Sequence, residues 1–266
     1  MADNRFIDYD KVSRIYDTSR VANTETTEKL IELLHIGGDS VVLDMGCGTG
    51  NYAASLQQVA KCVIGIDSSL GMIEQGRAKF AWFPLICGDI TTLPFRSGTF
   101  DAAFAIQVLH HVKEKELFLT EAHRVLKEGA CLAIDSCSHR QMRTFWLYHY
   151  FPRGFQVDLA RIPDCWEITS LLEGAGFSNI GIETSYQDVA VHHERPEQYL
   201  DKNFRDGQST FHLISEEDIE SGCEKLREDI ASGVAESVIR EFESKEARVG
   251  GSSIIYGRKT GPLYIS

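Results

Sequence analysis

The sequence predicts an α/β fold in which helices cover both faces of a mainly parallel sheet. Two observations carry this prediction. Between residues 41 and 135, short apolar runs alternate with segments of helical spacing, as in chains built from repeated strand–helix units. Each helical segment is also long enough to carry the chain back between two parallel strands. The chain has 266 residues, of which 43% are hydrophobic and 25% charged. It can therefore bury its own core, and we expect a single domain over 1–266.

Seven segments have the apolar composition of buried strands. The first ends in a cluster of glycines, and the next four follow at the intervals that crossover helices require. The last two lie on either side of a long insertion. The expected strands are 41–45, 62–67, 83–87, 100–106, 130–135, 179–184 and 252–256.

Helices are indicated by apolar spacing and by the residues that begin or end them. Ser68 and Ser69 can cap the second helix, because their hydroxyls can accept from the first free N–H groups. Gly129 stands where the third helix would stop. The expected helices are 51–59, a segment from Ser68 or Ser69 to about 79, 114–126 and 164–175.

Two segments depart from the alternation. Residues 136–163 are rich in aromatic side chains without a clean period. The longer insertion, 187–250, contains Ser215 with Asp218 three residues later, which is a capping box. An apolar stripe of helical period follows. We therefore expect an acidic amphipathic helix from about residue 216, broken at Gly233.

The charge balance excludes some classes of partner. The chain holds 27 Lys+Arg against 39 Asp+Glu, a net charge of −12. Nucleic acids and anionic membranes attract basic surfaces, so neither is expected as the main partner. Residues 216–248 hold 11 Asp+Glu and 5 Lys+Arg, half of the net charge. Residues 136–163 are basic instead, with four Arg and one Asp, which leaves room for an anionic or aromatic small ligand.

The cysteines and the apolar runs indicate the cellular compartment in which the protein is expected. The seven cysteines are scattered, without a C-x-x-C pair and without a His at zinc-ligand spacing, so no metal site is predicted. They are expected to be free thiols in a reducing cytosol. The polar N-terminus and the lack of an apolar run of about 18–20 residues argue against a secretory signal and a membrane span. We expect a cytoplasmic protein.

The most informative stretch is Gly46-Cys47-Gly48-Thr49-Gly50, directly after the first strand. Glycines between a strand and a helix let backbone N–H groups approach a ligand closely. Asn51 stands where the dinucleotide fingerprint G-x-G-x-x-G needs its last glycine, which disfavours a nicotinamide site. No Gly-Lys-Ser/Thr follows, which excludes a phosphate-gripping P-loop.

Carboxylates end the next two strands. Asp67 closes the second strand, where a carboxylate can accept from both hydroxyls of a ribose. Asp89 ends the third strand and can accept from an adenine amino group, with Ile90 donating its backbone N–H. Met72, one turn into the following helix, can pack on the adenine face. Together these residues predict a ligand site at the carboxyl edge of the sheet.

Three stretches carry a family resemblance: LDMGCGTG, then IGIDSS with GMIEQGRAK, and then GDITTLPFRSGTFDAAFAIQVLHHV. They resemble the class I S-adenosylmethionine-dependent methyltransferases, and among these the small-molecule group that includes the ubiquinone/menaquinone C-methyltransferases. The resemblance is specific over 40–135 and thins out over the two insertions. It implies a Rossmann-like sheet of seven strands with the last one antiparallel. It also implies S-adenosylmethionine as the cofactor and S-adenosylhomocysteine as the product.

The resemblance further implies where the cofactor would lie. Its methionine part would follow the glycine loop, its ribose would meet Asp67, and its adenine would lie between Met72 and Asp89. Asp44 would order the loop, and the backbone after the fourth strand would hold the amino-acid end. The implied cofactor-binding residues are Tyr16, Arg20, Asp44, Gly46, Cys47, Gly48, Gly50, Asp67, Ser68, Met72, Asp89, Ile90, Ile106 and Gln107.

The N-terminal segment and the two insertions are expected to cover this site. The N-terminal segment is similar to the family's leading helix, and residues 1–35 are expected to form helices that cover the cofactor. Tyr16 and Arg20 would meet the cofactor carboxylate, Arg20 as a charge-assisted donor. The insertions 136–163 and 187–250 leave the sheet at edges that face the methyl group in this fold. We expect them to form a substrate cap.

The expected reaction is methyl transfer by in-line displacement to a C, N or O atom of a small organic acceptor. It chiefly requires alignment of the reacting atoms, and a general base is needed only for an acceptor that carries a proton. His110 and His111 follow the fourth strand and are candidate catalytic bases. Tyr148 and His149 in the first insertion are candidate substrate-binding residues.

Other functions fit parts of the same pattern. A regulatory protein could bind the cofactor without catalysis through the same loop and carboxylates. A thiol or arsenite-type acceptor would need Cys137, Cys165 and Cys223 to converge above the cofactor. The net charge disfavours nucleic acid as the acceptor. The protein could be a monomer or a homodimer.

Overall fold

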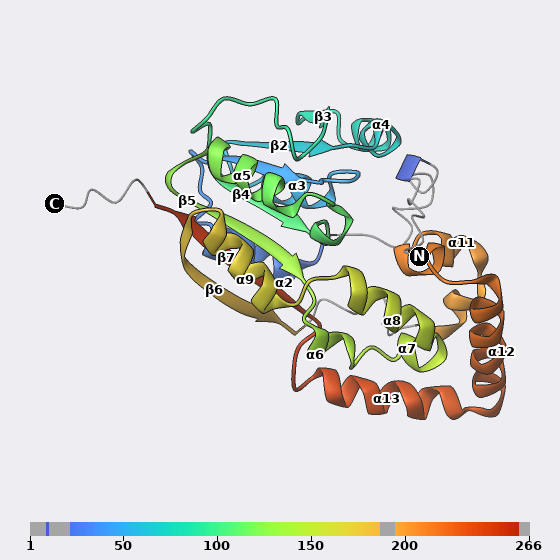
Figure 1. The fold of residues 1–266 in the computed structure, drawn as a ribbon. Coiled ribbons are helices and arrows are strands. Elements are labelled where there is room, and N and C mark those ends of the chain that lie inside the picture. The colour runs from blue at the N-terminus through green and yellow to red at the C-terminus, as the bar shows by residue number, and fades with distance from the viewer. Residues whose placement is uncertain (1–8, 11–21, 187–194, 261–266) are drawn as a thin grey trace.

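The computed structural model describes residues 9–10, 22–186 and 195–260. A seven-stranded sheet crosses it in the order β3-β2-β1-β4-β5-β7-β6 (Figure 1). β7 pairs antiparallel with both of its neighbours, and the remaining pairs are parallel. This confirms the predicted fold, including the antiparallel last strand. The strands are β1 (Val41–Met45), β2 (Cys62–Asp67), β3 (Leu85–Cys87), β4 (Phe100–Ile106), β5 (Leu126–Ser136), β6 (Phe177–Ser185) and β7 (Ser252–Lys259).

Helices cover both faces of the sheet and make three layers. Successive residues of β1 point into different hydrophobic clusters, Val42 toward the cluster that includes Leu30 and Leu43 toward the one that includes Leu119. This is the burial pattern of a parallel strand that is covered on both sides. The helices are α2 (Thr24–Leu33), α3 (Asn51–Leu56) and α4 (Leu70–Lys79) on one face, with α5 (Lys115–Val125) and α9 (Cys165–Gly174) on the other.

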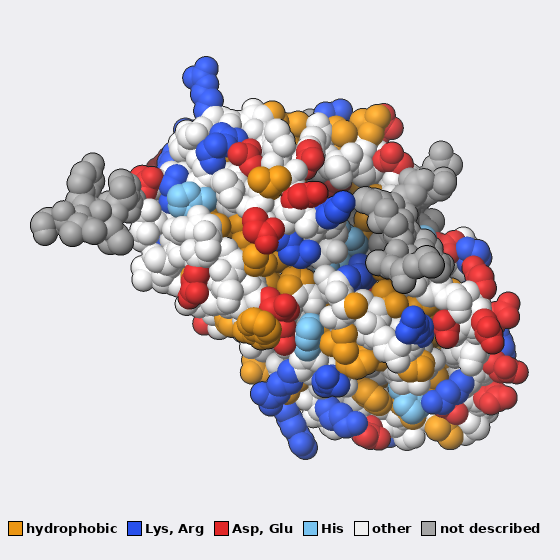
Figure 2. Space-filling model, viewed as in Figure 1, with side chains coloured by type: hydrophobic (Ala, Val, Ile, Leu, Met, Phe, Trp, Pro, Cys, Tyr) orange, Lys and Arg blue, Asp and Glu red, His pale blue; other side chains and the backbone are white. Residues whose placement is uncertain are grey.

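The two insertions form one helical body, the cap, beyond the carboxyl ends of the strands (Figure 1). Its own hydrophobic cluster combines Trp146 and Tyr150 from the first insertion with Tyr199 and Leu226 from the second. Figure 2 shows acidic side chains gathered along the edge of the cap. The cap comprises α6 (His139–Met142), α7 (Leu147–Tyr150), α8 (Pro152–Arg161), η2 (Pro196–Leu200), α11 (Lys202–Asp206), η3 (Ser209–His212), α12 (Glu216–Ser232) and α13 (Val234–Glu246).

The long insertion helix forms as its sequence signals indicate. The Ser215 hydroxyl accepts from the N–H of Asp218 in a capping box at the start of α12. Gly233, with φ +77°, separates α12 from α13. Among the described helices, none has the length and apolar composition needed to cross a membrane.

Several predicted boundaries are wrong, most clearly the helix stop at Gly129. α5 ends at Val125, and β5 begins at once, with Leu126 paired to Phe100. Gly129 lies inside β5 with φ +79°, where the register between β4 and β5 shifts. A bulge of this kind needs a residue that adopts positive φ without strain. β3 is also shorter than predicted, and α3 ends earlier.

A buried glutamine joins the cap to the sheet. Gln141 in α6 is 2% exposed, and its Nε2 donates to the Ser252 carbonyl at 2.7 Å. Its Oε1 accepts from the Ser138 N–H at 2.8 Å and from the Ser253 hydroxyl at 3.1 Å. One side chain therefore holds the beginning of the cap against the beginning of β7.

Replacing this residue by Gln141→Leu should lower the free energy of unfolding by on the order of 3 kcal/mol, because buried hydrogen-bonding groups on both sides lose their partner. Urea denaturation measures the change. The same substitution at the exposed Gln156 of α8 is the control, with an expected change below about 0.5 kcal/mol. Equal losses of unfolding free energy in Gln141→Leu and Gln156→Leu would contradict the role of Gln141 in joining the cap to the sheet.

Candidate functional site

The glycine loop is pinned to the end of β2. The N–H groups of Gly46 and Cys47 both donate to the Ile66 carbonyl, at 2.8 and 3.0 Å. The N–H of Gly48 donates to Asp67 Oδ2 at 2.9 Å. These bonds require a sharp bend after β1, and Gly46 and Gly48 supply it with φ values of +78° and +53°. The loop therefore takes its shape from the neighbouring strand.

The side chain in this loop is packed inward. A Cβ on Gly65 of β2 would lie 2.8 Å from Cys47 Sγ, so the thiol fills the space that this glycine leaves. Burial raises the pKa of the Cys47 thiol well above its usual range, and Asp44 and Asp67 raise it further. Cys47 is therefore neutral at physiological pH and has a packing role. Gly50 ends the loop as the N-cap of α3, with φ +83°.

Asp67 lies between the loop and the start of α4. Its Oδ1 accepts from the N–H of Ser69 at 2.9 Å, in addition to the bond from Gly48. Burial raises the pKa of Asp67, the two N–H groups lower it, and the nearby Asp10 carboxylate raises it again. The carboxylate is thus partly desolvated and close to like charge. A ligand with hydroxyl donors or positive charge would stabilise it.

Asp44, on β1, is a second buried carboxylate at this edge and is 2% exposed. Burial raises its pKa well above the usual range, and Asp67 raises it further. A hydrogen bond from the N–H of Ala53, in the first turn of α3, lowers the pKa of Asp44. The side chain thus connects β1 to the helix that follows the loop. Its predicted role in ordering the loop stays a prediction.

The residues predicted for the adenine lie in α4 and in the segment just after β3. Met72, in α4, is 2% exposed. Ile90 is partly buried against the core of the sheet. Asp89 is exposed, and its Oδ1 accepts from the N–H and the hydroxyl of Thr91 at 2.8 and 2.7 Å. Asp67 pairs with Cys87 across β2 and β3, so Asp89 follows on the same edge as Asp67.

Ser69, and not Ser68, caps α4. The Ser69 hydroxyl accepts from the Met72 N–H at 3.1 Å, whereas Ser68 is exposed. Asp10 reaches the same helix end, where its Oδ1 accepts from the Ser69 hydroxyl at 2.6 Å and from the Gly71 N–H at 2.8 Å. Sequence reasoning missed Asp10, because this contact joins residues far apart in the chain and no local pattern marks it.

The carboxyl end of β4 has an unusual backbone. Gln107 has φ +52°, which is uncommon for a residue other than glycine. Its N–H donates to the Asp135 carbonyl at 3.1 Å, and its Nε2 donates to Asp135 Oδ1 at 2.7 Å. Ile106 pairs with Asp135 across the strands. Sequence reasoning missed Asp135, although an acidic residue that closes an apolar strand is the same signal that identified Asp67.

The two candidate bases lie just beyond this point. His110 and His111 belong to η1 (Leu109–His111), and their rings are 4.0 Å apart. The Tyr9 hydroxyl and His111 Nε2 share a hydrogen bond of 2.8 Å. Tyr9 therefore joins the histidines at the end of β4, a contact that the sequence did not indicate. A base role for either histidine stays a prediction.

α7 directs Tyr148 and His149 to different neighbours. The Tyr148 hydroxyl donates to Asp158 Oδ2 at 2.9 Å. Burial raises the pKa of Tyr148 well above its usual range, and Asp158 and Cys137 raise it further, so the phenol lies near the end of β5. His149 Nε2 lies 2.9 Å from Lys225 Nζ of α12. The structure thus turns His149 toward α12, and its predicted contact with substrate stays a prediction.

Part of the predicted site falls on residues without a described placement. Tyr16 and Arg20 lie outside the described residues, as does most of the predicted covering segment 1–35. α2, which is described, packs on the face of the sheet through Leu30.

The three thiols of the arsenite hypothesis do not converge. Cys165 packs in the core of the sheet, whereas Cys223 belongs to the core of the cap. Cys137 donates to the Gly251 carbonyl at 3.4 Å. Within the described ranges, no three His, Cys, Asp or Glu side chains are grouped to hold a metal ion. The positions of these cysteines do not support the alternative of a thiol or arsenite-type acceptor.

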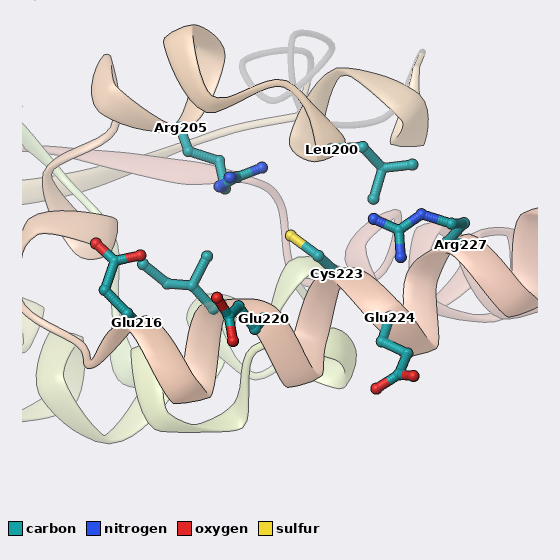
Figure 3. A pocket seen from close by; sticks show the side chains of 8 residues that line it. Leu200, Arg205, Glu216, Glu220, Cys223, Glu224 and Arg227 are labelled. Carbon is teal, nitrogen blue, oxygen red and sulfur yellow. The ribbon is translucent and has the colours of Figure 1, made fainter.

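A hollow of about 360 Å³ opens beside α12 (Figure 3). Arg205 and Arg227 point into it from opposite sides, and Glu216 and Glu220 line a third. Its lining comes from η2, α11 and α12, so the hollow belongs to the cap. Of the residues predicted to bind the cofactor or the substrate or to act as a base, none lines it, whereas Cys223 of the arsenite hypothesis does.

Comparison with known proteins identifies a family. A family model described as a methyltransferase domain matches residues 43–134. The chain is 32% identical over 158 residues to demethylmenaquinone methyltransferase of Streptomyces griseus, covering 52% of this chain and 69% of the relative. It is 31% identical over 134 residues to malonyl-[acyl-carrier protein] O-methyltransferase of Legionella pneumophila, covering 47% of each.

A solved structure is also similar to this chain in fold. A protein of Anabaena variabilis, described as a putative methyltransferase from an antibiotic biosynthesis pathway, superposes with a TM-score of 0.76 at 25% identity, over 90% of this chain and 98% of that one. Fold, loop and relatives together define the Rossmann-like fold of methyltransferases. The chain belongs to the class I S-adenosylmethionine-dependent methyltransferases, as the sequence motifs predicted. It spans about half the length of the Legionella relative.

The buried carboxylate of Asp44 should give stability a characteristic pH dependence. Because its pKa is raised in the folded state, the folded protein keeps a proton that the unfolded chain has lost above about pH 3.9. Wild type should therefore gain stability relative to Asp44→Asn as pH falls from about 8 toward 5. Urea unfolding of the ligand-free proteins measures the difference.

Asp101→Asn is the matched control. For Asp101, burial raises the pKa, but hydrogen bonds from Lys127 and Val41 outweigh it and leave the pKa lowered. The advantage of wild type over this variant should stay constant from about pH 8 to about pH 5 and shrink only below about pH 4. A parallel pH trend in the two comparisons would contradict the account of Asp44.

Proposed function

We propose that this protein transfers a methyl group from S-adenosylmethionine to a C, N or O atom of a small organic acceptor. The observation that carries the proposal is the Asp67 carboxylate, held between the N–H groups of Gly48 and Ser69 at the carboxyl end of β2. A carboxylate in that position suits the two hydroxyls of a ribose. Membership of the family supports the same cofactor.

The described residues fit this cofactor chemically. Burial raises the pKa of both Asp44 and Asp67; Asp67 raises that of Asp44 further, and Asp10 that of Asp67. Negative charge at this edge is therefore unfavourable without a partner. S-adenosylmethionine brings a sulfonium, an ammonium and two ribose hydroxyls, which would offset that charge. Gly46 and Gly48 keep the loop free of side chains where the ligand would approach.

The cofactor supplies an activated methyl group, because its sulfur departs as a neutral thioether. The work of the chain is then to align the reacting atoms. Asp67 and the glycine loop would hold the nucleoside part, and the backbone at Ile106 and Gln107 would hold the amino-acid end. The cap would exclude water and direct the acceptor. His110 or His111 would take the proton from an acceptor that carries one.

The cap supports an apolar or aromatic acceptor. The Tyr148 ring lies 6.0 Å from that of Phe145 and 5.2 Å from that of Phe155, and all three are partly exposed. Arg143 lies over Phe155 at 5.3 Å, which favours an anionic substituent. One relative is named for a quinone precursor and another for a malonyl thioester of a carrier protein, so the family relatives themselves span different acceptors.

Cofactor binding is the first test. Wild type should bind S-adenosylmethionine in calorimetry, and Asp67→Ala should weaken binding by about 100-fold or more, because two charge-assisted hydrogen bonds to the ribose are lost. Asp101→Ala, at the opposite end of the sheet, should leave the affinity within about twofold. Absence of binding to the wild type would overturn the proposal.

Turnover separates an enzyme from a regulatory binding protein. Wild type with S-adenosylmethionine should form S-adenosylhomocysteine in the presence of at least one acceptor from a panel of phenols, quinols, amines and thiols. Asp67→Ala should reduce the rate at subsaturating cofactor by the same factor as its affinity. Binding without product across the panel would favour the regulatory alternative.

A further inference from the structure

Asp135 is a carboxylate that the proposed cofactor contacts do not use. It is fully buried at the carboxyl end of β5. Its Oδ1 accepts from Gln107 Nε2 at 2.7 Å, and its Oδ2 accepts from the Ser252 hydroxyl at 3.0 Å. Burial of a carboxylate is costly unless its oxygens are hydrogen-bonded. The bond from Gln107 is therefore one of the contacts that make the burial of Asp135 tolerable.

Asp135 decides which way the Gln107 carboxamide points. A carboxylate can only accept hydrogen bonds, so the end of the amide that faces it must be Nε2. The same residue also holds the Gln107 backbone, through the N–H at 3.1 Å, in its conformation of φ +52°. Oε1 is consequently turned away from Asp135. It accepts no hydrogen bond from the described residues, and Gln107 is partly exposed.

Gln107 lies where the loop, the sheet and the cap meet. The next residue, Val108, contacts the loop so closely that a Cβ on Gly46 would lie 2.5 Å from it. On the other side, Gln107 Nε2 lies 3.9 Å from Cys137 Sγ. Cys137 is in turn close enough to the Tyr148 phenol to contribute to its raised pKa. Gln107 therefore stands between the proposed cofactor position and the cap.

We propose that Asp135 is a positioning residue that presents Gln107 Oε1 to the methyl acceptor. This inference rests on the proposed function and narrows its substrate class. A fixed oxygen with free lone pairs selects molecules that bring an O–H or N–H group beside the reacting atom. An analogue without that donor would displace water from Gln107 Oε1 and offer no hydrogen bond in return. The analogue should therefore bind more weakly.

The first arm of the test observes the carboxamide directly. In ¹⁵N-labelled protein, the side-chain NH₂ signals of Gln107 should be shifted and slow to exchange, because one N–H is bonded to a buried carboxylate. In Asp135→Asn these features should be lost, because the introduced carboxamide can meet either end of the Gln107 amide. Asp158→Asn, which changes a similarly buried carboxylate of the cap, should leave the signals unchanged. Unchanged signals in Asp135→Asn would overturn the proposal.

The second arm measures acceptor selection with two matched pairs: catechol against guaiacol, and 2-aminoethanol against 2-methoxyethylamine. Within each pair only the first carries a hydroxyl beside the reacting atom. Asp135→Asn should raise KM for the hydroxyl-bearing member by about tenfold and leave its partner and S-adenosylhomocysteine affinity within about twofold. Equal losses for both members, or a parallel loss of S-adenosylhomocysteine affinity, would show a merely structural role.

A reciprocal variant adds a rescue. In Asp135→Asn combined with Gln107→Glu, the introduced NH₂ group can donate to one carboxylate oxygen and leave the other facing the acceptor. Preference for the hydroxyl-bearing member should return, and its absence would count against the proposal. Failure of the proposed function and failure of this inference can be told apart. If wild type does not bind S-adenosylhomocysteine, the proposed function is lost. The amide signals still decide whether Asp135 positions Gln107.

Discussion

The constraint on which the site depends is the attachment of the glycine loop to the end of β2. One carbonyl, that of Ile66, receives two N–H groups, and the Asp67 carboxylate receives a third. The loop can bend this sharply only with glycine at positions of positive φ. Its geometry therefore follows from strand pairing in the sheet. A ligand that approaches this edge meets a backbone already held in place.

The same edge gathers three carboxyl groups. Asp10, Asp44 and Asp67 converge from three parts of the chain, and the pKa values of Asp44 and Asp67 are raised. This arrangement is unfavourable for the protein alone and becomes favourable with a cationic, hydroxyl-bearing ligand. The cap supplies a different chemistry, with partly exposed aromatic rings. Cofactor and acceptor recognition are thus divided between sheet and cap, with Gln107 at the boundary.

Local patterns were enough to predict the sheet and most of its acidic edge. Strand periodicity and the glycine loop identified Asp67, because both act within one strand–loop–helix unit. Contacts between distant segments were not predictable: Asp10 on Ser69, Tyr9 on His111 and Asp135 on Gln107. Gly129 was misjudged because a glycine after a helix indicates a stop or a bulge equally. The neighbours of His149 depend on α12, which its own segment does not reveal.

The most direct test of this account is a crystal structure of the protein with S-adenosylhomocysteine. The account predicts both ribose hydroxyls within about 3.2 Å of the Asp67 carboxylate. It also predicts the sulfur between the glycine loop and Gln107, facing the cap. A nucleoside bound elsewhere, for example in the hollow beside α12, or one whose ribose does not meet Asp67, would contradict the central claim.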